Sequence, residues 1–197
     1  MRKGEATRLR ILNTARPLIN KKGFKDTSIQ DIIVETGVKK GNLYFHFPNK
    51  DALGLALLEE AGDQYFDYLL KSIKSADSDP IGKISDLLNA ILRYHRRRQF
   101  VGGCIFGNTA LEMSDTDKAY TELIRRIFNR WTDNIVGYLK QAIEAGLLSD
   151  EIDPKPMARH IIAAMEGSIM MARLYKQEAP IKESIGYIRT LLRMKDK

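Results

Sequence analysis

The sequence predicts an all-α protein of about nine helices, because apolar residues recur at helical spacing and no useful stretch alternates as a strand does. Glycine and proline stand at the ends of these segments, where they stop helices. With 197 residues, 44% of them hydrophobic, the chain is long enough for one or two domains with a sizeable core. No run of 18 apolar residues and no apolar signal segment occur, so we expect a cytoplasmic protein without membrane contact.

The first helix is expected over residues 5–22. Its apolar residues have helical spacing, and Gly23, after two lysines, is a typical C-terminal stop. Pro17 lies inside this helix, where a proline removes one backbone hydrogen bond and favours a kink.

A short second helix is expected after Thr27 and Ser28, which are good N-cap residues, with Asp31 near the capping-box position. A break at residues 36–38 separates it from a third short helix over residues 39–47, which the next proline ends.

Asn49 is expected to cap a long fourth helix that reaches about residue 75. Beyond a loop rich in serine, aspartate and proline, glycine and proline breaks separate five further segments. These helices are expected over residues 80–98, 103–114, 117–146, 154–176 and 181–194.

Positive charge is concentrated near the N-terminus. Residues 1–50 carry eleven lysines and arginines against four acids, whereas residues 51–197 carry 21 of each sign. A basic module joined to a neutral body indicates a polyanionic partner. A solvated basic face would explain the charge alone equally well.

Residues 27–50 read TSIQDIIVETGVKKGNLYFHFPNK. A capped short helix, a turn with glycine and a second short helix make the helix-turn-helix pattern. In such a motif the second helix enters the major groove and its N-terminal side chains reach base edges, while the first helix crosses the phosphate backbone. The segment therefore predicts binding of double-stranded DNA.

Over residues 8–57 the sequence resembles the TetR family of transcriptional repressors. The resemblance rests on many positions at fixed spacing, namely Gly23-Phe24, Thr27-Ser28, Asp31-Ile32, Gly37-Val38, Gly41, Leu43-Tyr44, Phe47 and Lys50. The rest of the chain matches the family in length and helical layout.

This resemblance implies a DNA-binding domain over residues 1–50 and an effector-binding and dimerisation domain over residues 51–197. It implies a dimeric repressor that a small-molecule effector releases from a palindromic operator. The residues that it assigns to DNA contacts are Thr27, Ser28, Lys39, Lys40, Gly41, Asn42, Tyr44, His46 and Lys50.

Asn42 is the best candidate for reading a base, since asparagine can pair with adenine through two hydrogen bonds. The family often has serine or threonine at positions 39 and 42, so the operator sequence stays open. The alternative interpretations are that Tyr44 packs in the core, that His46 is a surface histidine and that the two lysines, 39 and 40, are a solvated pair.

A dimer places two helix-turn-helix modules about 34–36 Å apart on DNA. We expect a homodimer through residues 154–194, although the same apolar stripes also suit the chain's own core. A small apolar or aromatic effector is expected among the middle helices, where ordinary core packing is the alternative. The candidate contacts are Tyr65, Phe66, Tyr94, Phe100, Cys104, Asn108, Trp131, Met165 and Met170.

Cys104 is the only cysteine and is expected at a helix N-terminus, which lowers the pKa of a thiol. The same DNA-binding fold could therefore act as a thiol redox or electrophile sensor, while a buried inert cysteine is the other interpretation. The three histidines are far apart, so we expect no histidine metal site, while an oxygen-rich site is the alternative left open. We expect no metal and no cofactor. No catalytic motif is present, and we expect no enzyme; a helical enzyme with a solubilising basic N-terminus is the remaining hypothesis.

Overall fold

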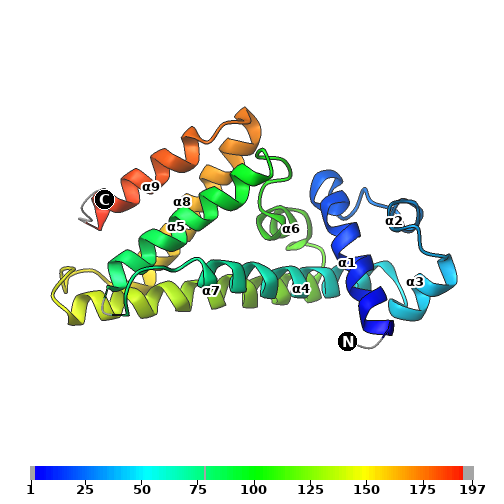
Figure 1. Cartoon of the computed structure of the whole chain (residues 1–197), viewed down its shortest axis with the longest axis horizontal. Coiled ribbons are helices and arrows are strands. Elements are labelled where there is room, and N and C mark those ends of the chain that lie inside the picture. Colours follow the sequence, from blue (N-terminus) through cyan, green and yellow to red (C-terminus); the bar gives the residue numbers. More distant parts are fainter. Residues whose placement is uncertain (1–2, 78, 193–197) are drawn as a thin grey trace. The chain divides into compact units, whose positions relative to one another are not determined.

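The computed structural model of the chain describes residues 3–77 and 79–192, and within them all regular structure is helical (Figure 1). This confirms the all-α prediction. The nine helices are α1 (Lys3–Lys22), α2 (Ile29–Thr36), α3 (Lys40–His46), α4 (Lys50–Lys71), α5 (Pro80–Arg97), α6 (Ile105–Met113), α7 (Lys118–Glu144), α8 (Pro154–Tyr175) and α9 (Ala179–Leu191).

Contacts divide the chain into two compact units. The first comprises Met1–Gln64 and Cys104–Arg126, and the second comprises Tyr65–Gly103 and Ile127–Lys197. The first unit thus holds α1 to α3 together with α6 and parts of α4 and α7. The expected division after residue 50 separates a DNA-binding domain from an effector-binding and dimerisation domain. It is a division by function, and it stays a prediction.

In the first unit, α1 packs against α2, and apolar residues of α1 to α4 are buried. Ile11, Ile32, Leu43 and Leu53 are completely buried in this core. Burial of each such side chain contributes about 1.5–3 kcal/mol. The helix α1 continues through Pro17, whose ring lies on the exposed side, so the proline does not end it.

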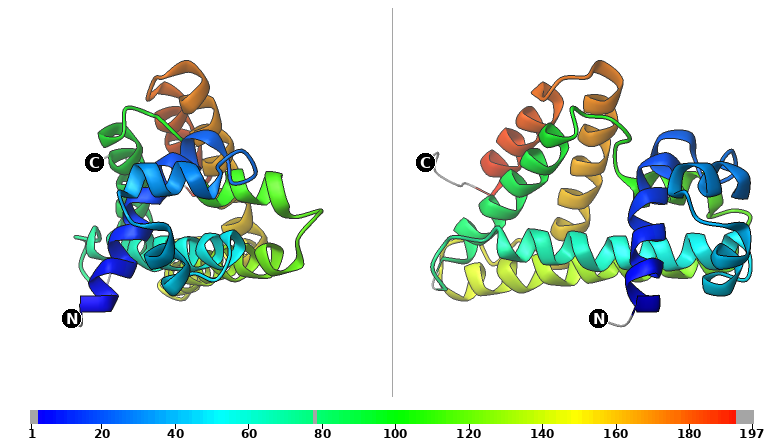
Figure 2. Two further views of the ribbon diagram at one scale, coloured as in Figure 1. Left: turned by 90° about the vertical axis from the view of Figure 1, so that its right-hand side faces the viewer. Right: turned by 45° about the vertical axis from the view of Figure 1, so that its right-hand side comes forward.

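In the second unit, α5, α8 and α9 lie side by side, as both views in Figures 1 and 2 show. Asp79 caps α5 by accepting a hydrogen bond from Gly82 N at 2.8 Å, and Asp153 caps α8. The buried face of α8 meets that of α9. The residues of these two faces are Ile161, Met165, Ile169, Ala172, Ile181, Ile185 and Ile188.

Several helix ends differ from the expected ones. Asn49 does cap α4, since its Oδ1 accepts from Ala52 N at 2.7 Å. The helix α4 ends at Lys71, and in the following loop Asp86 Oδ2 accepts from Lys74 N and Ser75 N. The last helix begins earlier than expected and ends at Leu191, and residues 193 and 194 of the expected dimer segment lie outside the described residues.

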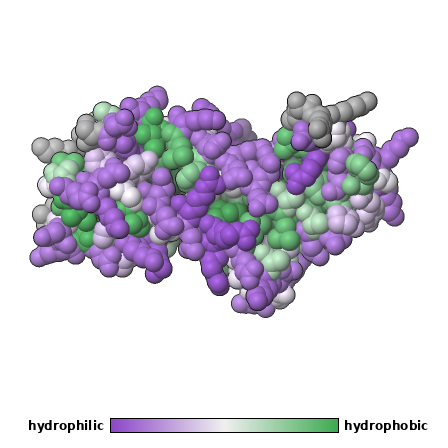
Figure 3. Space-filling view, turned by 90° about the horizontal axis from the view of Figure 1, so that it is seen from below, coloured by the Kyte–Doolittle hydropathy of each residue, from purple (hydrophilic) through white to green (hydrophobic). Residues whose placement is uncertain are grey.

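The face of the molecule drawn in Figure 3 is mostly hydrophilic, with hydrophobic areas showing between the polar side chains. Within the described part of the chain, none of the helices combines the length and the apolarity that a membrane span requires.

Candidate nucleic-acid interface

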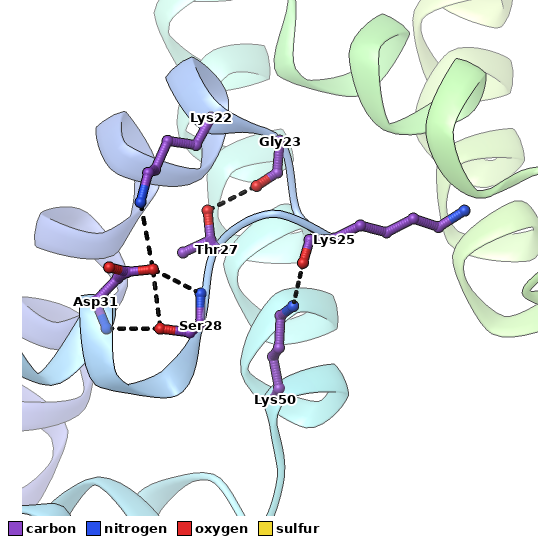
Figure 4. A network of polar contacts seen from close by, with 7 residues as sticks. All are labelled: Lys22, Gly23, Lys25, Thr27, Ser28, Asp31 and Lys50. Atoms are coloured by element: carbon purple, nitrogen blue, oxygen red, sulfur yellow. Dashed lines mark hydrogen bonds and ion pairs between the residues drawn. The ribbon is translucent and has the colours of Figure 1, made fainter.

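The helices α2 and α3 form a helix-turn-helix motif whose first turn is fixed by a capping box. Ser28 Oγ accepts from Asp31 N at 3.0 Å, and Asp31 Oδ2 accepts from Ser28 N at 2.9 Å (Figure 4). The helix ends at Gly37, whose left-handed φ of 65° suits glycine and whose N–H donates to Ile33 O. The expected cap and turn are confirmed.

The carboxylate of Asp31 is held inside this cap. Its pKa is lowered by hydrogen bonds from the backbone and the side chain of Ser28, and further by Lys22, whose Nζ lies 3.3 Å from Oδ2. The negative charge at the start of α2 is therefore paired locally with Ser28 and Lys22.

Burial separates the two faces of α3. Leu43 is fully buried against the core and Phe47 is 2% exposed, which fixes the helix in place. The opposite face is open to solvent, and it is on this face that a DNA-reading helix needs its polar side chains. The exposed residues on and before α3 are Lys39, Lys40, Gly41, Asn42, Tyr44 and Phe45, whereas His46 and Lys50 are half-buried.

Thr27, which was expected to contact a phosphate, is used within the loop in this structure, and its phosphate contact stays a prediction. Its side chain is completely buried, its Oγ1 donates to Gly23 O at 2.6 Å, and its N–H donates to Phe24 O. Both polar hydrogens are thus used within the loop, as Figure 4 shows for the hydroxyl. Thr27 supports the loop that leads into α2, and the exposed Ser28 is the better placed of the two hydroxyls.

Lys50 also contacts the loop before α2. Its Nζ donates to Lys25 O at 3.1 Å (Figure 4). The same Nζ lies 4.6 Å from the centroid of the Phe24 ring. The ammonium group therefore links the start of α4 to the α1–α2 loop.

The helix α6 also holds this loop and the end of α1. Glu112 accepts hydrogen bonds from Phe24 N at 2.9 Å and from Lys25 N, and Asn108 Nδ2 donates to Asn20 Oδ1 at 3.0 Å. A carboxylate that bridges two successive N–H groups is a strong hydrogen-bond acceptor. The helix α6 thereby fixes the position from which α2 begins.

The second unit contains a separate, partly open cavity of about 60 Å³. Its lining is apolar and aromatic, with Asn134 and Glu166 as the polar members. The lining residues are Tyr65, Phe66, Leu69, Leu70, Ile84, Leu87, Leu88, Ile91, Trp131, Asn134, Ile135, Ile161, Ile162, Met165, Glu166 and Ile169.

Comparison with known proteins identifies the family. A profile described as "Bacterial regulatory proteins, tetR family" matches residues 11–57, and one described as "Tetracyclin repressor-like, C-terminal domain" matches residues 80–188. The chain belongs to the TetR family. It is a DNA-binding transcriptional regulator, as the family description and the repressor relatives indicate.

Three relatives illustrate this membership. An uncharacterised regulator from the lacX 3′ region of Lactococcus lactis is 28% identical over 93% of this chain and 92% of its own. The repressor DhaR of a Mycobacterium species is 25% identical over 85% of this chain and 82% of its own. A TetR regulator of Chloroflexus aurantiacus has a solved structure with a TM-score of 0.90 and 32% identity, covering 98% of this chain and 97% of that one.

The structure brings together only part of the expected effector set of this TetR regulator. Tyr65, Phe66, Trp131 and Met165 line the cavity. Tyr94 packs its ring against Tyr65 from outside the lining, and Phe100 lies in a turn. Met170 is 55% exposed on α8. The remaining two, Cys104 and Asn108, belong to the first unit.

Cys104 is the N-cap residue of α6, as expected, and its side chain is half-buried. In the described part of the chain, no three His, Cys, Asp or Glu side chains are grouped so as to hold a metal ion.

Two residues at or beside the candidate interface were missed from the sequence. Phe45 is 82% exposed on α3, and its position two residues after Leu43 already places it on the opposite side of the helix. Glu112 is 88 residues away from Phe24, so no local pattern signals their contact.

Proposed function

We propose that the protein is a homodimeric repressor that binds a palindromic operator through α3 and leaves it when a small apolar or aromatic effector binds in the second unit. The observation that carries the DNA part is the exposed row Lys39, Lys40, Gly41 and Asn42 at the N-terminal end of a helix whose other face is buried. Lysines there attract phosphates, and Asn42 is within the turn that reaches base edges in such motifs.

The first experiment is selection of bound duplexes from a random DNA pool at physiological salt. The wild type, Lys40→Ala and Tyr44→Ala are compared, and Lys118→Ala, which removes an exposed lysine of the same unit, is the control. We expect the wild type and Lys118→Ala to enrich the same palindrome and the two α3 variants to enrich it weakly. Equal enrichment by all four proteins would contradict a role of α3.

The dimer proposal rests on an exposed apolar stripe along α8 and α9. Gly167 and Gly186 lie inside these helices, where glycine costs about 1 kcal/mol relative to alanine, yet an added Cβ at either would touch nothing within 4 Å. Packing within one chain does not explain these two glycines, whereas the close approach of a second copy would explain them. The other stripe members are Ala163, Met170, Leu174, Tyr187 and Leu191.

Sedimentation of Met170→Lys tests this surface. A lysine at a 55% exposed position leaves the folded chain intact but places a charge in an apolar interface. We expect it to shift the protein towards monomer and to weaken operator binding. Val101→Lys, at a 45% exposed position of the same unit, is the matched control. A dimer of unchanged stability in Met170→Lys would overturn this interface.

The effector proposal rests on the apolar cavity. Its volume of about 60 Å³ is far below the roughly 300–1,000 Å³ of drug-sized ligand sites. The effector is therefore either very compact or enters as the lining helices separate. The helix α4 carries both Lys50 of the DNA-binding part and Tyr65 and Phe66 of the lining, so its displacement would connect the two events.

Trp131 provides the readout, because it is the single tryptophan of the chain and lines the cavity. Toluene is a compact apolar probe. We expect it to change the tryptophan fluorescence of the wild type and to lower operator affinity, with both effects altered in Phe66→Ala and retained in Val101→Ala. A change in tryptophan fluorescence without any loss of operator affinity would contradict a coupling between the cavity and DNA binding.

A second candidate for the regulatory site is Cys104, because it begins the helix whose other end holds the α1–α2 loop through Glu112. The test is operator release by N-ethylmaleimide from the wild type and from Cys104→Ser. Release of the wild type alone supports a thiol sensor, and equal behaviour of the two proteins removes it.

A further inference from the structure

Phe45 is an aromatic residue that α3 presents to solvent. It is 82% exposed, more than any other aromatic side chain among the described residues, and its recorded ring contact is an edge-on one with the neighbouring His46 at 5.1 Å. The apolar residues on the other side of α3 are buried, so this helix is packed against the core. The exposure of the Phe45 ring therefore does not result from loose packing of α3.

Helix geometry places the ring at the centre of the exposed face. Successive residues of an α-helix are rotated by roughly 100°, so Gly41 and Phe45 each lie within about 20° of the direction opposite to Leu43. Gly41 is one turn before Phe45 and has no side chain, and an added Cβ there would touch nothing. Near Gly41 the backbone of α3 can therefore approach DNA closely, while the ring of Phe45 projects from the next turn.

The major groove offers one apolar group, which is the 5-methyl of thymine, and phenylalanine is among the side chains that contact it. The polar residues beside Phe45 on α3 can donate hydrogen bonds to phosphates and base edges, whereas a phenyl ring has no such donor. Exposure of a large ring also leaves apolar surface in water in the free protein, and a partner group would remove that surface from water.

We propose that Phe45 is a specificity-determining residue, whose ring packs against the methyl group of a thymine in each half of the operator. This inference rests on the proposed function, since it requires α3 to lie in the major groove. It adds a direct apolar selection for thymine to the hydrogen-bonding selection expected of Asn42.

Deoxyuridine tests the contact, because it lacks only the methyl group of thymine. Each thymine of the selected operator is replaced in turn, symmetrically in the two half-sites, and affinity is measured for the wild type and for Phe45→Ala. Leu111→Ala is the matched control, because Leu111 is 90% exposed on α6 of the same unit. Thermal unfolding of the variants checks that the exposed substitutions leave the fold intact.

We expect one thymine position at which loss of both methyl groups weakens binding by the wild type and by Leu111→Ala about tenfold, as burial of one methyl per half-site predicts. Phe45→Ala should bind the operator more weakly and should not distinguish thymine from deoxyuridine at that position. If loss of the thymine methyl groups weakens binding equally in the wild type and in Phe45→Ala, the inference is overturned. It is also overturned if no thymine position shows a loss of wild-type affinity on replacement by deoxyuridine.

Two further outcomes separate this inference from the proposed function. An operator that is bound tightly by the wild type and equally by Phe45→Ala overturns the inference alone. Failure of the wild type to select any duplex overturns the proposed function and the inference with it. A changed oligomeric state of Phe45→Ala would assign the ring to a protein contact and would also overturn the inference.

Discussion

The carboxylate of Glu112 accepts a hydrogen bond from the backbone N–H of Phe24, and so connects α6 to the loop that begins the helix-turn-helix motif. Its other oxygen accepts from the next N–H, at Lys25. The start of α2 is thus set by a residue of a helix that lies far along the sequence, and the two residues share one structural unit.

Glu112→Gln is expected to lower operator affinity about tenfold, because an amide can accept only one of the two hydrogen bonds and turns its own N–H groups towards the other. Hydrogen bonds to charged groups contribute about 1.5–3 kcal/mol. The measurement is operator binding by the folded protein, with thermal unfolding recorded beside it. Glu122→Gln, on α7 of the same unit, is the control, and equal affinities of the two variants would show that the connection does not position α2.

Gly54→Ala is expected to destabilise the first unit by about 1–3 kcal/mol, the usual cost of overpacking. A Cβ at this position of α4 would lie 2.1 Å from Tyr120 Oη and 2.4 Å from the Phe24 ring. Chemical denaturation measures the free energy of unfolding. Gly137→Ala, where an added Cβ meets nothing, should be neutral or slightly stabilising.

Tyr120→Phe should relieve part of this cost. Tyr120 is 1% exposed and its Oη has no hydrogen-bond partner among the described residues, so loss of the hydroxyl removes both the obstacle and a buried polar group. The double variant should be more stable than Gly54→Ala alone. Strictly additive changes in the free energy of unfolding for the two substitutions would contradict a contact between the added Cβ and the Tyr120 hydroxyl.

Thr27→Val is expected to lower the free energy of unfolding by about 1 kcal/mol, since it removes the buried hydrogen bond to Gly23 O while keeping the shape of the side chain. Operator affinity at a temperature where the variant is folded should stay close to that of the wild type. A variant of normal stability and poor affinity would return Thr27 to the phosphate contacts.

His95 is expected to make folding sensitive to mild acid. Burial, and then the charge of Arg98, lower the pKa of His95 from 6.5 to about 4. Below pH 6.5 the unfolded chain takes up a proton that the folded chain refuses until about pH 4, so stability falls across that window, by about 3 kcal/mol at most.

His95→Gln should therefore have the shallower loss of unfolding free energy between pH 7 and pH 4, measured by denaturation at each pH. His160→Gln, which replaces an exposed histidine, is the control and should follow the wild type. Parallel curves for the wild type and His95→Gln would refute a buried neutral imidazole.

Local signals made the helix-turn-helix motif predictable from the sequence. Each signal is local: Ser28 and Asp31 cap each other across three residues, and the left-handed Gly37 pairs with Ile33, four residues before it. The role of Thr27 was not predictable, because a buried hydroxyl and an exposed one have the same sequence pattern, and only the fold of the loop distinguishes them.

The effector candidates show the limit of periodicity. Aromatic and methionine residues at helical spacing identify side chains that face other helices, but the packing of four helices decides which of them border a cavity. Trp131 and Met165 do so, whereas Met170 points outward from the same helix as Met165. Glu112 was hidden for a similar reason, since its partners are distant in sequence.

The most direct test of DNA binding through α3 is the salt dependence of operator affinity for the wild type, Lys40→Ala and Lys118→Ala. The account predicts a steep linear fall of log affinity with log salt for the wild type. It predicts a slope smaller by about two for a Lys40→Ala dimer that loses one phosphate contact per subunit, and no change for Lys118→Ala. A slope near zero for the wild type, or the same slope for all three proteins, would contradict it.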